Sequence, residues 1–598
     1  MNSPPSPGLS GAPDPLPIAD YALLGDCQSA ALVGKSGSID WLCWPRFDSP
    51  ACFAALLGTS EHGRWLIAPD LPIRATTRAY RPETMVLETL FTTDQGTVVL
   101  IDFMVPGGSS VVRIVEGRTG TVPMTCELVL RFDYGATIPW VTRLAAGDGL
   151  HAVAGPDQVV LQADTPMHGE GMTSVARFTA RPGARVRFVL THAAAHAAQP
   201  VPPDADAALA EVEAFWRDWS SRGTYRGPWR AMVERSLLTL KALSHTETGG
   251  IIAAPTTSLP EWPGGERNWD YRFCWLRDAS LTLRALMRAG HREEATAWGG
   301  WLRRVIAGAP AQMHTLYGLA GERAFGERTI PWLPGYGGAR PVRVGNGAAD
   351  QLQLDIFGEL MEALFQEART GLFPPGQSWP LQVALIEHLE TVWHRPDEGI
   401  WEVRGGQQLF TFSKVMAWVA VDRALHGAAA FGLPAPLERW RALRSTIHDD
   451  VLRHGFNRAK GCFTQVYGGD ALDASLLLLP LVGFLPAHDP RITDTVAAIE
   501  RELMVDGLVL RYRSADGLPN GVGVFLACSF WFVDNLILQG RKADAHAMFS
   551  RLVALANDVG LMAEEYDPIN HRMLGNFPQA FSHLALVNTA LNLESRAR

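Results

Sequence analysis

The stretch AAQPVPPDADAALAEVEAFWRDW, residues 197–219, divides the sequence into two parts of different character. Its first half is polar and rich in proline, which indicates a joint between structural units. Its second half spaces Leu209, Val212, Trp216 and Trp219 three or four residues apart, as on one face of a helix. We therefore predict a linker helix within residues 201–225.

Before this joint the sequence has short runs of β-forming residues separated by turn residues. TMVLETLFTTDQGTVVLIDFMV, residues 84–105, predicts two strands joined around Asp94, Gln95 and Gly96. QVVLQA and SVARFTARPGARVRFVLTHA, residues 158–163 and 174–193, continue the pattern. We predict an antiparallel β-sandwich over residues 18–200, preceded by a disordered tail over residues 1–17.

After the joint, residues 226–598 carry apolar stripes at helical spacing. Long loops rich in glycine and aromatic residues precede every second helix, so six helical hairpins in a ring would place these loops on one face. Loops on a rigid scaffold are where binding and catalytic groups usually lie. The pattern predicts twelve helices, beginning near Trp229, Asp278, Arg292, Asp350, Pro380, Phe412, Pro436, Ala474, Pro490, Val524, Arg541 and Pro578.

Composition excludes several classes of protein. Of the 598 residues 47% are hydrophobic and 19% charged, which is typical of a folded globular chain. The net charge of -9 and the absence of a long Lys/Arg run argue against nucleic-acid binding. The apolar run ASLLLLPLVGFL, residues 474–485, is too short to span a bilayer. Seven scattered cysteines without a CxxC pair, and a start without a signal peptide, favour a cytoplasmic protein.

Three of the long loops combine tryptophan or tyrosine with carboxylates. Sugars are bound by such mixtures, because hydroxyl groups take charged hydrogen-bond partners while the C–H face packs on an aromatic ring. The loops are ERNWDYRFCWLRDASLTL, DEGIWEVRGGQQLFTFS and LMAEEYDPINHRMLGNFPQAFSH, residues 266–283, 397–413 and 561–583. A small carbohydrate is therefore the expected partner. The sequence leaves the oligomeric state open, with a homo-oligomer as one alternative.

Cleavage of a glycosidic bond requires one carboxyl group as acid and a second that activates water or attacks the sugar. Glu402 together with either Glu564 or Glu565 supplies such a pair from separate loops. Each candidate also has an ordinary structural explanation. A loop glutamate is usually a solvated charge, Arg277 and Asp278 suit a structural ion pair, and Asp278 suits a helix N-cap.

Several long motifs resemble glycoside hydrolase family 15, the inverting glucoamylase-type enzymes, in the bacterial branch with a trehalase-like N-terminal domain. GSIDWLCWPRFDSPACFAALLG, residues 37–58, is similar to the signature of that N-terminal domain. The motifs of the catalytic domain then follow in order: RNWDYRFCWLRDASLTLRAL, GIWE, SKVMAWVAVDRAL, GCFTQVYGGDALDASLLLLPLVGF, and AEEYDP with LGNFPQAFSH. The resemblance implies a β-sandwich followed by an (α/α)6 barrel over residues 226–598.

The resemblance also implies roles for individual residues. Glu402 matches the general acid and Glu564, after the alanine of the family's AE motif, matches the base, which leaves Glu565 without an assigned role. Where fungal relatives carry a second glutamate after the acid, this chain has Val403. The matched substrate-binding residues are Tyr271, which helps place the attacking water, Trp275, Arg277, Asp278, Trp401 and, at the cleavage point, Arg511.

We therefore expect an inverting, exo-acting α-glucosidase that needs no cofactor or metal. Glu402 is expected to be protonated and Glu564 ionised. Trehalose is the leading substrate, and short α-1,4 or α-1,6 glucosides such as maltose or isomaltose are the alternative. The leaving-group side would include Arg46, Trp332 and Arg343. A phosphorylase and a non-catalytic sugar-binding protein remain as rivals from other classes.

Overall fold

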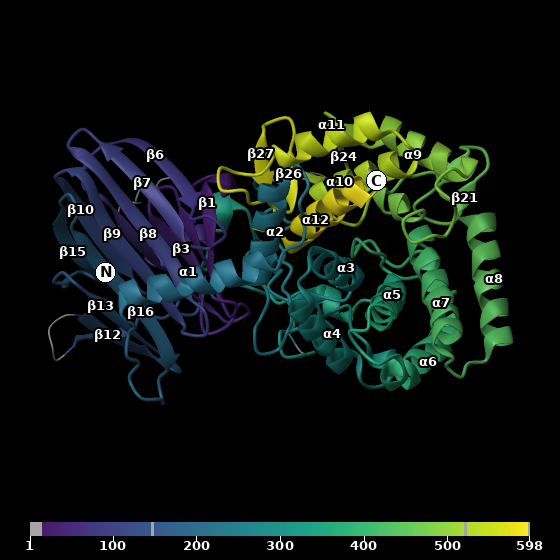
Figure 1. The fold of residues 1–598 in the computed structure, drawn as a ribbon, viewed down its shortest axis with the longest axis horizontal. Coiled ribbons are helices and arrows are strands. Elements are labelled where there is room, and N and C mark those ends of the chain that lie inside the picture. The colour runs from purple at the N-terminus through teal and green to yellow at the C-terminus, as the bar shows by residue number, and fades with distance from the viewer. Residues whose placement is uncertain (1–14, 145–148, 324, 520–522, 596–598) are drawn as a thin grey trace, which may run out of the picture.

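The computed structural model describes residues 15–144, 149–323, 325–519 and 523–595. We call residues 15–200 the β part and residues 201–595 the helical part. Figure 1 shows the two parts side by side, with helix α1 (Ala205–Ser221) leading from the strands to the other helices. Most of the predicted disordered tail, residues 1–14, lies outside the described residues.

The β part contains two antiparallel sheets. The first has the order β1-β2-β3-β5-β10-β15-β14, with β4 paired to β3, and the second has the order β11-β12-β13-β16-β9-β8-β7-β6. The first sheet consists of β1 (Tyr21–Gly25), β2 (Ala30–Gly34), β3 (Ser38–Cys43), β4 (Ala51–Phe53), β5 (Arg64–Pro69), β10 (Val122–Val129), β14 (His168–Glu170) and β15 (Thr173–Ala180). The second consists of β6 (Ile73–Tyr80), β7 (Leu87–Thr93), β8 (Gly96–Val105), β9 (Ser110–Gly120), β11 (Trp140–Arg143), β12 (Gly149–Ala154), β13 (Asp157–Ala163) and β16 (Arg185–Ala194).

Alternation of side chains explains why these segments form sheets. In β10 and β7 every second side chain is buried, because one face of each sheet is packed on the core. The predicted hairpin of residues 84–105 is confirmed: β7 pairs with β8 from Leu87 opposite Asp102 to Thr93 opposite Gly96. Strand β8 is buried on both faces, since α1 packs against its outer side.

Helix α1 begins where the sequence predicts it. The Asp204 side chain accepts a hydrogen bond from the Ala207 backbone N–H at 2.8 Å and so caps the helix. The apolar residues that predicted the helix are all buried, namely Leu209, Val212, Trp216 and Trp219.

The rest of the helical part carries eleven α-helices within the described residues. Within the described residues, the loops between them contain strands of two or three residues, such as β26 (Glu565–Asp567), and short 3-10 helices. The helices are α2 (Arg230–Ala242), α3 (Ala279–Ala289), α4 (Arg292–Ile306), α5 (Asp355–Arg369), α6 (Pro375–Val392), α7 (Thr411–Phe431), α8 (Leu437–His454), α9 (Pro490–Glu502), α10 (Leu526–Leu538), α11 (Lys542–Val553) and α12 (Ala580–Ser595).

One predicted helix is wrong in type. The segment at Ala474 forms η7, a 3-10 helix of five residues that ends at Leu478. Pro480 explains the difference, because it lacks the N–H that an α-helix needs to continue. The Leu477 carbonyl instead accepts a hydrogen bond from the Asn535 side chain at 2.8 Å.

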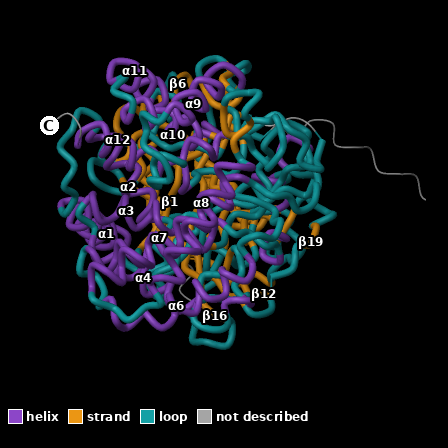
Figure 2. The backbone as a smooth tube through the Cα atoms, turned by 90° about the vertical axis from the view of Figure 1, so that its right-hand side faces the viewer, coloured by secondary structure: helices purple, strands orange, loops and turns teal. Residues whose placement is uncertain are grey.

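Contacts between elements arrange the helices in two layers. Helix α3 packs against α5, α5 against α7, α7 and α10 against η7, α10 against α12, and α12 against α3 again. Outer helices such as α8 pack on these through one apolar stripe: Trp440, Leu443, Ile447 and Val451. In the view of Figure 2 the helices lie nearest the reader and most strands lie behind them. Among the described helices none has the length and apolarity that crossing a bilayer requires.

Candidate functional site

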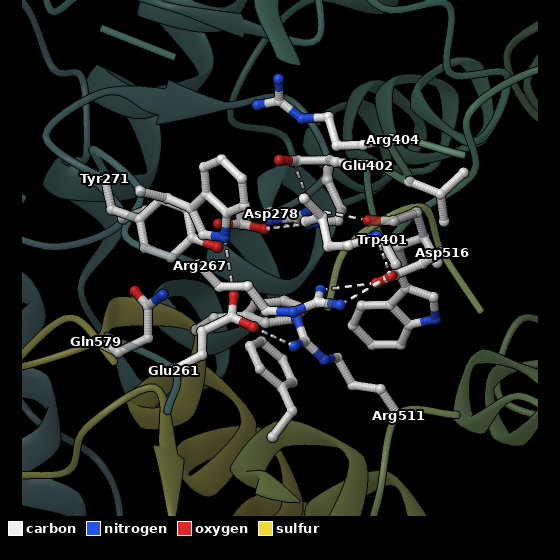
Figure 3. Close-up of a pocket in the computed structure, with 18 residues that line it drawn as sticks. Glu261, Arg267, Tyr271, Asp278, Trp401, Glu402, Arg404, Arg511, Asp516 and Gln579 are labelled. Atoms are coloured by element: carbon white, nitrogen blue, oxygen red, sulfur yellow. Dashed lines mark hydrogen bonds and ion pairs between the residues drawn. The ribbon is translucent and has the colours of Figure 1, made fainter. Parts of the chain in front are cut away.

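A pocket lies where the loops before α3, α7, α10 and α12 meet (Figure 3). It encloses about 670 Å³, part of which is open solvent. The prediction that these loops share one face is thereby confirmed. The pocket is lined by Ala253, Glu261, Arg267, Trp269, Tyr271, Arg277, Asp278, Ile400, Trp401, Glu402, Val403, Arg404, Arg511, Asp516, Leu518, Phe525, Gln579 and Phe581.

The charges in this lining are balanced. Four carboxylates (Glu261, Asp278, Glu402 and Asp516) face four guanidinium groups (Arg267, Arg277, Arg404 and Arg511). Arg267 and Asp516 form a two-pronged pair with both N–O distances at 2.7 Å. A pocket with paired charges and aromatic walls suits an uncharged ligand rich in hydroxyl groups.

Glu402 is held at the pocket by two donors from the loop before α3. The Trp275 indole N–H donates to its Oε1 at 2.6 Å, and the Arg277 guanidinium donates to the same oxygen at 3.0 Å. The backbone of Glu402 has φ 58°, in the left-handed region that a non-glycine residue rarely adopts. Such strained positions concentrate at functional sites, where the surrounding contacts hold them.

The neighbours of Glu402 are fixed by the same loops. Arg277 also donates to the Ile400 carbonyl at 2.9 Å and pairs with Asp278 at 3.3 Å. Asp278 occupies the position before α3, but its side chain makes no capping hydrogen bond there, so the N-cap interpretation is wrong. The Trp401 indole N–H donates to both oxygens of Asp473, at 2.8 and 3.0 Å, which fixes that ring in the wall.

The two adjacent glutamates at residues 564 and 565 have different partners. Glu565 pairs with Arg511 at 2.8 Å and accepts a hydrogen bond from the Gly523 backbone N–H at 2.6 Å. Glu564 accepts from the Asn576 backbone N–H at 3.1 Å. Both are fully buried, and neither is among the described residues that line the pocket.

Gly575 shows how tightly the Glu564 carboxylate is enclosed. A Cβ atom at Gly575 would lie 2.5 Å from Glu564 Oε2, closer than real Cβ contacts come, and the residue has φ 72°. Only glycine fits both the conformation and the space.

Burial raises the pKa of Glu564 above its ordinary value, and the charge of Glu261 raises it further. Arg511 and the Asn576 N–H lower it in part. Arg511 contacts Glu261 at 2.5 Å, so one guanidinium serves both Glu261 and Glu565. Protonation of Glu564 is therefore coupled to a buried group of carboxyls around a single cation.

Tyr271 lies close to both candidate catalytic glutamates. Burial, then the charge of Glu564 and then that of Glu402, raise the pKa of the Tyr271 hydroxyl. Its ring packs edge-on against Trp275, with centroids 5.1 Å apart. The Tyr271 hydroxyl therefore keeps its proton near neutral pH and acts as a neutral hydrogen-bonding group.

Most of the predicted site residues come together here. Tyr271, Arg277, Asp278, Trp401, Glu402 and Arg511 line the pocket, and Trp275 lies directly behind Glu402. None of the three residues expected on the leaving side is among those that line the pocket, and their role there stays a prediction. Arg46 pairs with Asp48 and Glu322, Trp332 donates to the Tyr134 carbonyl, and the Arg343 guanidinium stacks on the ring of Trp269, which does line the pocket.

Sequence reasoning missed eight polar or aromatic wall residues: Glu261, Arg267, Trp269, Arg404, Asp516, Phe525, Gln579 and Phe581. Trp269 donates its indole N–H to Glu261 at 3.0 Å and carries the Arg404 guanidinium 4.8 Å above its ring. Arg267 and Trp269 stand within the quoted loop of residues 266–283, so their proximity to the matched residues was a usable signal. Among the described residues no group of His, Cys, Asp and Glu side chains is arranged to hold a metal ion.

Comparisons with known proteins match both parts of the chain. The model of glycosyl hydrolases family 15 matches residues 227–591, and the model described as trehalase-like, N-terminal matches residues 9–201. A trehalase of Mycolicibacterium smegmatis is 39% identical over 611 residues, which cover 96% of this chain and 91% of that protein. An isomaltose glucohydrolase of Kribbella flavida is 28% identical over 319 residues, which cover 50% of this chain and 74% of that protein.

A solved structure of a bacterial glucoamylase complexed with acarbose has a TM-score of 0.73 to this chain. The likeness covers 98% of this chain and 96% of that one at 12% sequence identity. This finding confirms a glucoamylase-like fold with N-terminal antiparallel sheets and a helical C-terminal part.

Proposed function

The chain belongs to glycosyl hydrolases family 15, and from this premise we propose that it hydrolyses trehalose with inversion at the attacked carbon. The substrate assignment rests on the 39% identity to a trehalase, which extends over both the β part and the helical part. The likeness to the isomaltose glucohydrolase covers only half of the chain and is weaker. A short α-1,4 or α-1,6 glucoside is therefore the second candidate.

The scaffold that we propose is an (α/α)6 barrel, in which η7 replaces one inner helix. The circular sequence of contacts from α3 through α12 and back to α3 supports it. Such a ring directs the N-termini of α3, α7, α10 and α12 to one end, where the pocket lies.

We propose that Glu402 is the general acid. Its Oε1 already accepts from Trp275 and Arg277, so the proton that reaches the glycosidic oxygen is carried by Oε2. The same two residues hold the carboxyl group in place, which keeps the acid aligned as the C–O bond breaks.

Glu564 acts as the base in this mechanism. It removes a proton from a water molecule that Tyr271 helps to orient, and the water oxygen bonds to the anomeric carbon as the leaving glucose takes the proton from Glu402. Inversion requires room for this water, which corresponds to carboxyl groups roughly 6.5 to 9.5 Å apart. Trehalose then yields one β-glucose and one α-glucose.

The raised pKa of Glu564 has a consequence for this mechanism. The base must be ionised, whereas burial and Glu261 favour its protonated form. We expect the acidic limb of the pH–rate profile to lie above the ordinary pKa of a glutamate.

The first test is a proton NMR time course with trehalose, maltose and isomaltose in parallel, observed before mutarotation mixes the anomers. Equal initial α- and β-glucose from trehalose is the expected result. Release of β-glucose from maltose or isomaltose while trehalose stays intact would select the second candidate. Release of α-glucose alone from trehalose, without initial β-glucose, would contradict inversion.

Two variants assign the roles. Glu402→Gln and Glu564→Gln should each lose at least about 10²-fold in turnover while remaining folded. Activity that requires phosphate and yields glucose 1-phosphate would instead indicate a phosphorylase, and binding without turnover a sugar-binding protein. The cytoplasmic location, the homo-oligomer and the domain limits stay predictions from the sequence.

A further inference from the structure

We propose that the β part positions the catalytic loop through Arg272, with Tyr134 as the positioning residue that the β part contributes. This inference rests on the proposed function, because the loop of residues 266–278 carries Tyr271, Trp275 and Arg277. The β part would then be needed for the chemical step itself, in addition to stability.

Arg272 joins the two parts of the chain inside the protein. It is fully buried and forms a two-pronged pair with Asp270, with Nε–Oδ1 at 2.8 Å and Nη2–Oδ2 at 2.7 Å. Its remaining donors point into the β part, where Nη1 reaches the Ser49 carbonyl at 2.8 Å and Nη2 reaches the Tyr134 hydroxyl at 2.8 Å. Arg272 stands between Tyr271 and the segment that holds Trp275, so its position fixes theirs.

The turn that presents Tyr134 is strained. Asp133 and Tyr134 have φ 52° and 58°, and Gly135 follows with φ 91°. Two consecutive non-glycine residues in the left-handed region cost free energy and persist only where surrounding contacts enforce them. The Trp332 indole N–H donates to the Tyr134 carbonyl at 2.9 Å, so the helical part holds this turn from outside as well.

A second contact supports the same loop independently. The Trp41 indole N–H donates to the Pro255 carbonyl at 2.8 Å. The backbone beside Pro255 pairs with the catalytic loop: Ala254 N–H donates to the Tyr271 carbonyl and Ala253 N–H to the Phe273 carbonyl, each at 2.9 Å. The β part therefore holds the catalytic loop in two ways: through the side chain of Arg272, and through the backbone segment beside Pro255 that pairs with the loop.

Removal of the Tyr134 hydroxyl leaves a buried guanidinium N–H of Arg272 without that partner. An unsatisfied buried donor costs roughly 1 to 3 kcal/mol, which the loop can relieve by shifting. Displacement of a catalytic group by about 1 Å costs up to about 10²-fold in rate. Because Tyr271 and Trp275 act on the water and on the acid, the shift should lower kcat more than it raises KM.

The test compares Tyr134→Phe with Tyr21→Phe in the full chain. The Tyr21 hydroxyl donates to Asp40 at 2.8 Å within the β part, and Tyr21 is also buried, so its variant is a matched loss of one buried phenol hydrogen bond. We expect kcat on trehalose at least about tenfold lower in Y134F than in Y21F, with KM changed less than about threefold. Thermal unfolding should show similar losses in both.

Hydrogen exchange provides a readout that does not depend on activity. Amides in the peptide of residues 267–276 should exchange at least about tenfold faster in Y134F than in the wild type, and Y21F should match the wild type. Equal kcat and equal exchange in the two variants would overturn the inference. If the wild type leaves trehalose intact, the proposed function fails, while the exchange comparison still decides this inference. If Y134F does not fold, Trp332→Phe, which frees the Tyr134 carbonyl, should give the same accelerated exchange.

Discussion

Replacement of Glu261 by glutamine should shift the acidic limb of the pH–rate profile by about one unit to lower pH. Glu261 is buried in the pocket wall, where it pairs with Arg511 at 2.5 Å and accepts from Trp269 at 3.0 Å. Its charge is the largest contribution after burial to the raised pKa of Glu564. Glutamine keeps the shape and can accept the Trp269 hydrogen bond, so the substitution removes mainly the charge.

The size of the shift follows from electrostatics. Two like charges about 5 Å apart repel by roughly 3 kcal/mol at an effective dielectric constant of about 20. Arg511 already offsets part of this repulsion, because it contacts Glu261 directly. If about half remains, its removal lowers the pKa of Glu564 by about one unit, since one unit corresponds to roughly 1.4 kcal/mol. The base is active when ionised, so a lower pKa extends activity to lower pH.

The assay is the pH dependence of kcat/KM for glucose release from trehalose in the wild type and E261Q. Glu327→Gln is the control, because Glu327 pairs with Arg404 at 3.0 Å and Arg343 at 3.4 Å and is not among the groups that mainly set the pKa of Glu564. The control should keep the wild-type acidic limb. An unchanged limb in E261Q, or one shifted to higher pH, would refute the electrostatic account of the base.

Three further substitutions test other parts of the structure. Trp275→Phe removes the 2.6 Å hydrogen bond to Glu402 and should lower kcat about tenfold with little change in the unfolding midpoint, as steady-state rates and calorimetry would show. Burial raises the pKa of Glu359 to about 8. Between about pH 4.5 and 8 the native state therefore binds a proton at this residue that the unfolded state has lost. As pH rises through this range, the free energy of unfolding falls. Glu359→Gln should therefore raise the unfolding midpoint more at pH 7.5 than at pH 4.5, and an equal effect at both would contradict this. Arg113→Met leaves the fully buried Asp102 without its 2.8 Å partner and should cost about 3 to 5 kcal/mol in denaturant unfolding, whereas a neutral effect would show that the pair is dispensable.

Local patterns in the sequence predicted most of the elements correctly. The spacing of Trp216 and Trp219 with their neighbours predicted α1, and the turn residues at 94–96 predicted the β7–β8 hairpin. Such predictions succeed because helix and strand periodicity depends on neighbours close in the chain. At Ala474 the apolar spacing was helical, yet Pro480 removed the hydrogen bond that would have extended the helix beyond five residues.

The sequence by itself determined which loops form the pocket and which glutamates stand in them, because motifs such as WLRD and AEEYDP are contiguous. Only the tertiary structure decided the partners of those glutamates. Arg511 binds Glu261, which lies 250 positions away in the sequence, and Trp275 donates a hydrogen bond to Glu402, which lies 127 positions away. It also decided that Arg272 connects the loop to Tyr134, 138 positions earlier. Contacts of this kind join segments that are far apart in the chain, and no local pattern of charge or hydrophobicity specifies how such segments pack.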